Sequence, residues 1–178
     1  DVVLSQNFFA VHPDLWRYDA GRALLLRGDG RGGLTAMPGQ ESGLLVYGEQ
    51  RGAAVGDFDA DGRPDLVVTQ NGAQTKLYRN TGAKPGLRVR LDGPEGNPYG
   101  IGSEVRLRFR ESLGPAREVR GGGGYWSQDS PILVLGTPTA PTAILVRWPG
   151  GQVIERPVPV GALEVRVSRD GEVKATLP

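Results

Sequence analysis

An internal repeat restricts what the first half of this chain can fold into. Residues 1–7, Asp-Val-Val-Leu-Ser-Gln-Asn, match residues 65–71, Asp-Leu-Val-Val-Thr-Gln-Asn, at an offset of 64 positions. Residues 24–30 match residues 76–82 at an offset of 52, so the first copy contains 12 additional residues in or near Phe8–Tyr18. Self-similarity of this kind is typical of architectures in which each copy is one small supersecondary unit. We expect the additional residues to form a long loop.

Each copy is expected to supply a few short strands. Aliphatic and β-branched runs are separated by glycine and proline, a texture that indicates strands joined by turns rather than helices. One strand follows the aspartate that opens each match, and a second runs through the LLLR or KLYR segment. A third is predicted near Leu44–Tyr47 and a fourth at Ala53–Val55. About four strands per copy predict a propeller-like blade, in a chain that begins part-way through a repeat.

From about Leu87 the chain changes to a regular alternation of apolar and charged residues. Leucine or valine alternates with arginine in Leu87–Leu91. In Val105–Arg110 the apolar residues Val105, Leu107 and Phe109 again alternate with arginine. Further strands are predicted at residues 132–135, 143–148, 153–156, 164–168 and 172–176. Period-two alternation places one face of a sheet against a core and the other in water. We therefore predict an all-β chain, with repeats in residues 1–83 and a β-sandwich-like domain in residues 87–178.

Composition argues against several classes of protein. The 21 basic and 20 acidic residues give a net charge of +1, which is not that of a nucleic-acid binder. There is no cysteine, so disulfides and thiolate metal sites are excluded. No apolar run is long enough to cross a bilayer, and we expect no membrane insertion. An enzyme centred on the only histidine, His12, remains an alternative, but we expect a non-catalytic protein.

The segment Asp57–Asp65, Asp-Phe-Asp-Ala-Asp-Gly-Arg-Pro-Asp, carries the clearest chemistry of the sequence. Calcium takes six to eight oxygen ligands, and carboxylates at alternate loop positions can converge on one point when the backbone curls. Gly62, at the sixth position, permits the sharp turn that such a loop requires. The predicted ligands are the carboxylates of Asp57, Asp59, Asp61 and Asp65 and the backbone carbonyl of Arg63.

The residues after the loop favour a rigid calcium site over a sensor. Leu66–Val68 is typical of a strand, whereas an EF-hand continues into a helix and carries glutamate at position 12, where Val68 stands. We expect a dissociation constant of roughly 10⁻⁴–10⁻³ M or tighter, as in extracellular modules. The alternative is a solvated acidic turn, because aspartate and glycine are common in turns.

At these residues the chain resembles the FG-GAP/VCBS repeat family, known from integrin α-subunit propellers and bacterial surface proteins. Residues 56–66 carry the resemblance and residues 77–82 continue it. The resemblance implies blades of a β-propeller with calcium in the loops between blade strands. It places the family's ligands on the five residues of the predicted site.

The second half resembles the ASPIC/UnbV domain, which follows such repeats in cartilage acidic protein-like proteins. The matching segments are residues 97–105, 120–128 and 146–151. Together the two resemblances cover nearly the whole chain, and neither supplies a catalytic residue.

These observations predict a calcium-binding module of a secreted, periplasmic or cell-surface protein that acts in protein–protein contact, adhesion or self-assembly. The alternative is a carbohydrate-binding module, in which Tyr125 and Trp126 stack on sugar. The outward arginines of the second half would then attract an anionic polysaccharide. Both features also have plain structural explanations, because aromatic residues fill cores and charged sheet faces prevent edge aggregation.

Overall fold

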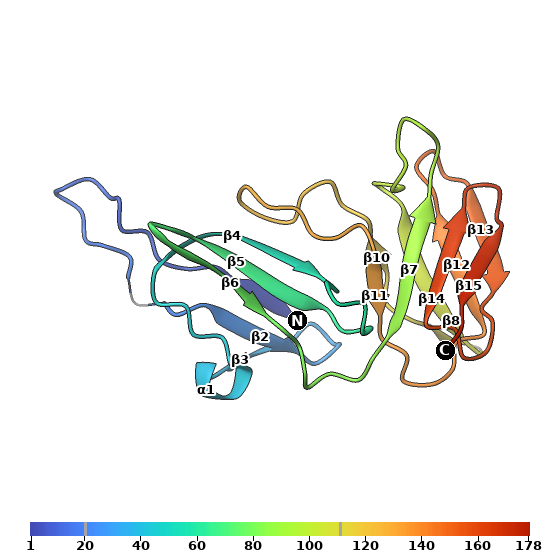
Figure 1. Cartoon of the computed structure of the whole chain (residues 1–178), viewed down its shortest axis with the longest axis horizontal. Coiled ribbons are helices and arrows are strands. Elements are labelled where there is room, and N and C mark those ends of the chain that lie inside the picture. Colours follow the sequence, from blue (N-terminus) through green and yellow to red (C-terminus); the bar gives the residue numbers. More distant parts are fainter. Residues whose placement is uncertain (20, 111) are drawn as a thin grey trace. The chain divides into compact units, whose positions relative to one another are not determined.

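The structure is a computed structural model that describes residues 1–19, 21–110 and 112–178. In the described residues it contains fifteen strands and one helical turn, α1 (Gly39–Ser42), which confirms the all-β prediction (Figure 1). Contacts divide the chain into two compact units. Unit 1 comprises Asp1–Ala54, Leu66–Arg79 and Gly124–Ser127, and unit 2 comprises Val55–Asp65, Asn80–Gly123 and Gln128–Pro178. No helix in the described part of the chain is long and apolar enough to cross a membrane.

Two three-stranded sheets are built from the first half of the chain. The first has the order β1 (Val2–Leu4), β2 (Leu24–Gly28), β3 (Leu34–Met37). The second has the order β4 (Glu49–Gly56), β5 (Asp65–Asn71), β6 (Ala73–Tyr78). The additional residues of the first copy form the predicted loop, closed by backbone hydrogen bonds between Phe8 and Tyr18 at 2.7 and 3.2 Å.

The sheet registers reproduce the sequence repeat residue by residue. Val3 of β1 lies opposite Leu25 of β2, and Val67 of β5 lies opposite Leu77 of β6. The offset of 64 positions matches Val3 to Val67, and the offset of 52 positions matches Leu25 to Leu77. The repeat is therefore structural, with β1 equivalent to β5 and β2 equivalent to β6.

A side-chain hydrogen bond is repeated with the strands. The Asp1 carboxylate accepts the Gly28 N–H at 2.7 Å, and the Asp65 carboxylate accepts the Asn80 N–H at 2.8 Å. In each copy the aspartate at the start of the first repeated segment accepts this bond, and the donors Gly28 and Asn80 match each other at the offset of 52 positions. The strand predicted at Ala53–Val55 is confirmed as part of β4, which lies beside β5 in the second sheet rather than beside β3.

The predicted strand near Leu44–Tyr47 is wrong. The chain forms β3 and α1 before this segment, and residues 44–47 are irregular. Leu44 and Val46 are nevertheless buried, and they pack with Leu66 and Val68 in the small core of the first half. Alternate burial produces the same apolar pattern whether or not a segment is hydrogen-bonded to a neighbouring strand. The pattern alone therefore could not distinguish this segment from a strand.

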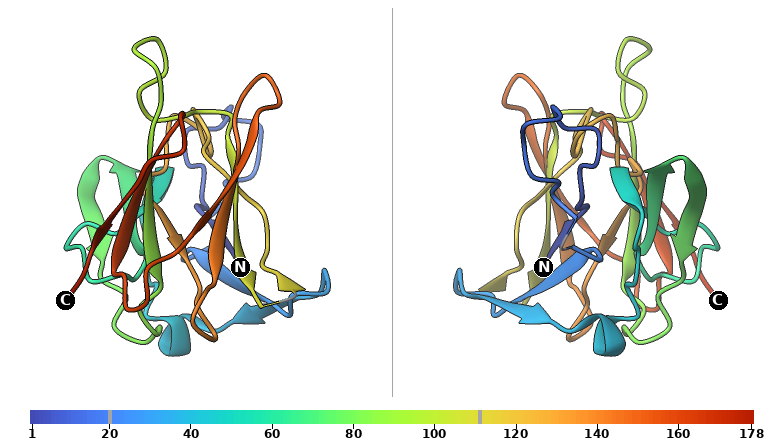
Figure 2. Two further views of the ribbon diagram at one scale, coloured as in Figure 1. Left: turned by 90° about the vertical axis from the view of Figure 1, so that its right-hand side faces the viewer. Right: turned by 90° about the vertical axis from the view of Figure 1, so that its left-hand side faces the viewer.

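Unit 2 contains the predicted β-sandwich. The strands are β7 (Leu87–Asp92), β8 (Glu104–Phe109), β9 (Ser112–Leu113), β10 (Arg117–Glu118), β11 (Leu133–Leu135), β12 (Ala143–Arg147), β13 (Val153–Pro157), β14 (Glu164–Ser168) and β15 (Val173–Thr176). One sheet has the order β10-β8-β12-β13 with β9 paired to β8, and the other has the order β11-β7-β14-β15. Figure 2 shows β7, β14 and β15 in one layer and the strands of the other sheet beside it.

Alternation decides which face of each sheet is buried. Leu87, Val89 and Leu91 of β7 are buried, while Arg88 and Arg90 between them are partly exposed. Apolar residues of both sheets join in one core that also takes in Trp148. Each fully buried valine or leucine contributes about 1.5–3 kcal/mol relative to an exposed one, so this core dominates the stability of unit 2.

Candidate functional site

The acidic loop joins β4 to β5 and belongs by its contacts to unit 2. The Gly86 N–H donates to the Gly62 carbonyl at 2.8 Å, and the Arg63 Nε donates to the Ala83 carbonyl at 2.7 Å. These bonds hold the loop against the segment that leads into β7. The loop is therefore anchored to the sandwich unit, although its sequence resembles the repeats. The expected domain limits, residues 1–83 and 87–178, stay a prediction.

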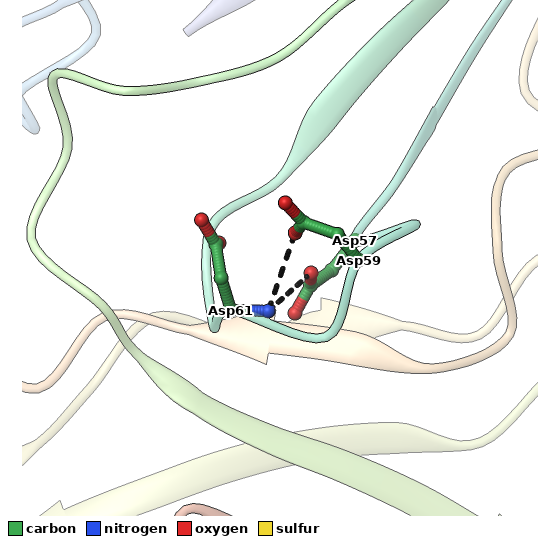
Figure 3. A group of neighbouring side chains, drawn as sticks. All are labelled: Asp57, Asp59 and Asp61. Atoms are coloured by element: carbon green, nitrogen blue, oxygen red, sulfur yellow. Dashed lines mark hydrogen bonds between the residues drawn. The ribbon is translucent and has the colours of Figure 1, made fainter.

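Three of the predicted ligands lie together. Asp57, Asp59 and Asp61 each offer a carboxylate oxygen, and these oxygens all lie within 4.8 Å of one another (Figure 3). The Asp57 carboxylate accepts the N–H of Asp61 at 3.0 Å and the N–H of Gly62 at 2.9 Å. The loop backbone is thus curled around the first aspartate, and the curl brings the alternate side chains to one place.

Gly62 permits the curl for two reasons. Its φ of +80° lies in the left-handed region, which L side chains rarely adopt. A Cβ at this position would also lie 3.1 Å from the Gly86 carbonyl oxygen and 3.2 Å from the Pro85 Cβ. Glycine therefore serves both the turn and the close approach of the loop to residues 85–86.

Asp65 is placed differently from the other three aspartates. It is buried, and its two carboxylate oxygens accept the N–H groups of Phe58 at 3.1 Å and Asn80 at 2.8 Å. It is not part of the carboxylate group of Asp57, Asp59 and Asp61. The structure thus gives Asp65 a role in closing the loop, and its role as a calcium ligand stays a prediction. The equivalence of Asp1 and Asp65 in the repeat was the sequence signal for this closing role.

Two arginine side chains, whose part in the site was not predicted, pair with carboxylates of the acidic loop. Arg88 of β7 donates from Nη1 to Asp57 and from Nε to Glu164 at 2.8 Å. Burial opposes the charge of Arg88, but the hydrogen bonds to Glu164 and Asp57 outweigh it and raise the pKa of the guanidinium. Arg63, predicted to contribute only its backbone carbonyl, also donates from Nη1 to the Asp61 carboxylate at 2.8 Å. The four carboxylates are therefore partly neutralised by the chain itself.

The donor set fits a hard divalent cation. The clustered donors are carboxylate oxygens, with no sulfur or imidazole of the kind that favours zinc or copper. Calcium accepts irregular arrangements of six to eight oxygens, whereas magnesium requires a near-ideal octahedron. The three clustered carboxylates are ligands of the kind that calcium takes, and the backbone carbonyl of Arg63 stays a predicted ligand.

Tyr125 and Trp126 occupy the tip of a tight turn. Gly124 and Ser127 pair across it in an isolated bridge, which leaves the two aromatic residues in the middle. Tyr125 is 64% exposed and Trp126 is 89% exposed, with ring centroids 6.2 Å apart. The aromatic pair therefore fills no core, and its assignment as a ligand-binding pair stays a prediction.

The outward arginines of the sandwich are less available than the sequence suggested. Arg106 donates to Glu104 at 2.9 Å and Arg108 pairs with Glu155. Hydrogen bonds from Arg106 and Arg147 hold the pKa of Glu104 below its ordinary value, so Glu104 is charged in both of these ion pairs at neutral pH. Arg106 and Arg108 are thus engaged by carboxylates, which reduces their attraction for an anionic polysaccharide.

The lone histidine lies on the exposed loop between Phe8 and Tyr18. The His12 Nδ1 is 3.5 Å from the Asp14 carboxylate, and both side chains are largely in solvent. An acid–base catalyst needs groups held near a bound substrate, and this exposed pair has no such surroundings. The geometry gives no support to catalysis at His12.

Each half of the chain contains a segment that matches a known protein family. Residues 51–83 match the family model described as FG-GAP repeat, and residues 93–168 match the model described as ASPIC and UnbV. One segment of the chain is thus similar to the FG-GAP repeat and another to the ASPIC/UnbV domain. The resemblance inferred from the sequence is confirmed. The FG-GAP match contains the acidic loop, β5 and β6, and the ASPIC/UnbV match runs from before β8 to the end of β14.

Two curated relatives share this part of their sequence. Cartilage acidic protein 1 of Xenopus tropicalis is 27% identical over 121 residues, which is 65% of this chain and 19% of the relative. Cartilage acidic protein 1 of Homo sapiens is 28% identical over 137 residues, which is 71% of this chain and 21% of the relative. The chain thus spans about a fifth of the length of the curated relatives it matches.

Proposed function

We propose that this FG-GAP and ASPIC/UnbV chain is a calcium-stabilised, non-catalytic interaction module of a secreted, periplasmic or cell-surface protein. One observation carries the proposal. The carboxylates of Asp57, Asp59 and Asp61 lie within 4.8 Å of one another inside a segment that matches the FG-GAP repeat. Relatives named for cartilage support an extracellular setting.

The proposed ligands are the carboxylates of Asp57, Asp59 and Asp61, joined by the backbone carbonyl of Arg63 and by Asp65. When bound, calcium would supply a charge that balances the carboxylates. The chain contributes the geometry, because the bonds from Asp61 and Gly62 to Asp57 already curl the loop. A curled loop loses little conformational freedom on binding, and a ligand that binds the native state stabilises it.

The proposed partner is a protein or a second copy of the chain. Strand β6 pairs with β5 on one side and ends the described sheet on the other, and five of its six residues are exposed. A sheet edge of this kind has unpaired N–H and C=O groups that another strand can pair with. Lys76 lies within this edge and restricts which strands can approach it.

The calcium proposal is tested by thermal unfolding of the EDTA-treated chain with and without 1 mM calcium. A dissociation constant of about 10⁻⁴ M would stabilise the fold by about 1.4 kcal/mol, or roughly 3–6 °C in Tm for a chain of this size. Asp59→Ala should abolish the shift, and Asp14→Ala, an exposed aspartate outside the loop, should retain it. An unchanged Tm of the parent in calcium would refute the proposed site.

The interaction proposal is tested separately by light scattering and by cross-linking, with Lys76→Thr as the variant. Self-assembly through β6 should strengthen in Lys76→Thr if strands of two copies pair at this edge, because the substitution removes the charge that hinders pairing. If the chain stays monomeric at all concentrations, with and without calcium, the proposal of self-assembly is overturned.

A further inference from the structure

A hollow of about 380 Å³ lies over β4 and β5 in unit 1, beside the turn that carries the two exposed aromatic residues. Its lining residues are Arg51, Gly52, Thr69, Gln70, Asn71, Tyr125 and Trp126. Small-molecule sites have volumes of roughly 300–1,000 Å³, so the hollow can hold a compact ligand. We propose that it binds a neutral saccharide, with one sugar ring stacked on Trp126. This proposal goes beyond calcium binding and does not depend on it.

The floor of the hollow is held in place by a buried carboxylate. Glu49 is 5% exposed and accepts hydrogen bonds from Arg51 at 2.9 Å, Asn71 at 2.9 Å and the Phe9 N–H at 3.2 Å. Arg51 is also restrained by the Phe8 ring, whose centroid lies 5.4 Å from its guanidinium carbon. Arginine has five N–H donors and asparagine a carbonyl oxygen besides its amide, so both retain capacity for a ligand. Fixed donors and acceptors lower the entropy cost of binding.

Gly52 allows the aromatic turn to come close to β4. Its N–H donates to the Thr69 hydroxyl at 2.9 Å, which joins β4 to β5 below the hollow. A Cβ at Gly52 would lie 3.3 Å from the Trp126 carbonyl oxygen and 3.3 Å from the Thr69 hydroxyl. A larger residue at this position would therefore push the turn away from the floor.

Trp126 is presented in an unusual backbone conformation. Of the two residues inside the Gly124–Ser127 turn, Trp126 alone has a positive φ, at 52°. This position of a turn usually carries glycine or asparagine, and a bulky residue with positive φ is an outlier. Such outliers cluster at functional sites, where the surrounding structure maintains them. Here the outlier places a large apolar ring in water at the rim of a polar hollow.

The combination of groups matches the chemistry of a sugar. A pyranose has an apolar C–H face that stacks on an aromatic ring, and hydroxyl groups at its edge that pair with amides and guanidinium groups. Trp126 and Tyr125 provide the aromatic surface, and Gln70, Asn71 and Arg51 provide the polar partners.

Charge decides in favour of a neutral sugar. Arg51 is the one charged residue that lines the hollow in the described structure, and its guanidinium is already paired with Glu49 at 2.9 Å. A uronic acid or a sulfated sugar would need an unbalanced cation to offset its desolvation. The site thus differs from the arginine face that the sequence suggested, because its polar groups come from β4 and β5.

The proposal is tested on a glycan array and then by isothermal titration with neutral hexasaccharides of the cello-, xylo-, manno- and chito- series. Heparin and polygalacturonate oligosaccharides serve as anionic comparisons. We expect at least one neutral hexasaccharide to bind, and we expect Trp126→Ala and Asn71→Ala each to weaken that binding at least tenfold. Trp16→Ala is the matched control, because Trp16 is 91% exposed outside the hollow.

Stacking should also change the emission of a Trp16→Phe chain, in which the buried Trp148 is the other emitter and provides a constant signal beside Trp126. Thermal unfolding of each variant checks that a loss of binding is not caused by a loss of fold. Because Trp126 is exposed, we expect Trp126→Ala to change the stability of the fold only slightly. The proposal is overturned by a parent chain that binds no neutral glycan, by binding restricted to anionic glycans, or by neutral-glycan binding that persists undiminished in Trp126→Ala.

Discussion

Arg88 donates a hydrogen bond to the carboxylate of Asp57 across 31 positions of sequence, and so ties the first aspartate of the acidic loop to strand β7. The same guanidinium bonds to Glu164 of β14 at 2.8 Å. The Asp57 side chain is only 1% exposed, so this ion pair is formed away from water. A buried charge that loses its partner is costly, and this fact makes the loop and the sandwich energetically dependent on each other.

Arg88→Gln should make the chain more dependent on calcium. Removal of one partner of a buried pair costs about 3–5 kcal/mol, so the variant should unfold at a clearly lower temperature in EDTA. Calcium can take over the neutralisation of Asp57, so the rise in Tm on calcium addition should exceed that of the parent chain. Arg90→Gln, on the same strand, is the control. An equal or smaller calcium response in Arg88→Gln would contradict the coupling.

Gly62→Ala should destabilise the chain more than Gly72→Ala does. Both glycines have positive φ, at +80° and +66°, but a Cβ at Gly72 meets nothing within 4 Å. Backbone strain costs about 1–2 kcal/mol at either position, and only Gly62→Ala adds the collision with residues 85 and 86. Urea unfolding in EDTA measures the difference, and calcium titration should show weakened binding in Gly62→Ala alone. Equal losses would mean that the loop does not need its close approach.

Asp65 should matter for stability in the absence of calcium. Its two carboxylate oxygens satisfy backbone N–H groups of Phe58 and Asn80, so Asp65→Ala should cost about 1–3 kcal/mol in EDTA by leaving those donors without partners. Asp65→Asn keeps one acceptor oxygen and should lose less. Chemical denaturation in EDTA compares the two variants. An Asp65→Ala chain as stable as the parent in EDTA would show that Asp65 serves as a metal ligand only.

Acid should weaken the charged face of the sandwich through Glu104. Hydrogen bonds from Arg106 and Arg147 place the pKa of Glu104 below its ordinary value of 4.5. A carboxyl group with a lowered folded-state pKa stabilises the fold above its ordinary pKa, and the stabilisation is lost as pH falls through the folded-state value. Glu104→Gln should therefore flatten the fall of stability below about pH 4.5, measured by urea unfolding at several pH values.

Glu95→Gln provides the matched comparison for this acid dependence, because Glu95 is exposed on the loop after β7. Its substitution should leave the stability at neutral pH as in the parent, because no ion pair of the described residues involves Glu95. Identical profiles for the parent and Glu104→Gln would mean that the ion pairs with Arg106 and Arg147 add nothing measurable to stability.

The amino-acid sequence by itself determined the features that depend on near neighbours. Alternation in Leu87–Leu91 set the buried face of β7, and the spacing of three aspartates before Gly62 set a loop whose carboxylates converge. The repeat determined that Val3 and Leu25 pair in the same way as Val67 and Leu77. Periodicity and turn residues act over a few positions and a repeat is visible by comparing the chain with itself, so all three can be read without knowledge of the fold.

Tertiary structure alone decided the relationships between distant segments. The sequence showed no reason for Arg88 to lie on Asp57, or for Trp126 to share a hollow with Arg51 and Asn71. It also could not separate the buried, irregular run Leu44–Tyr47 from a strand. A buried or charged residue can be paired with any suitable residue that the packed chain brings near it. Many distant residues would be suitable partners for the same local pattern. Only the assembled fold selects one of them.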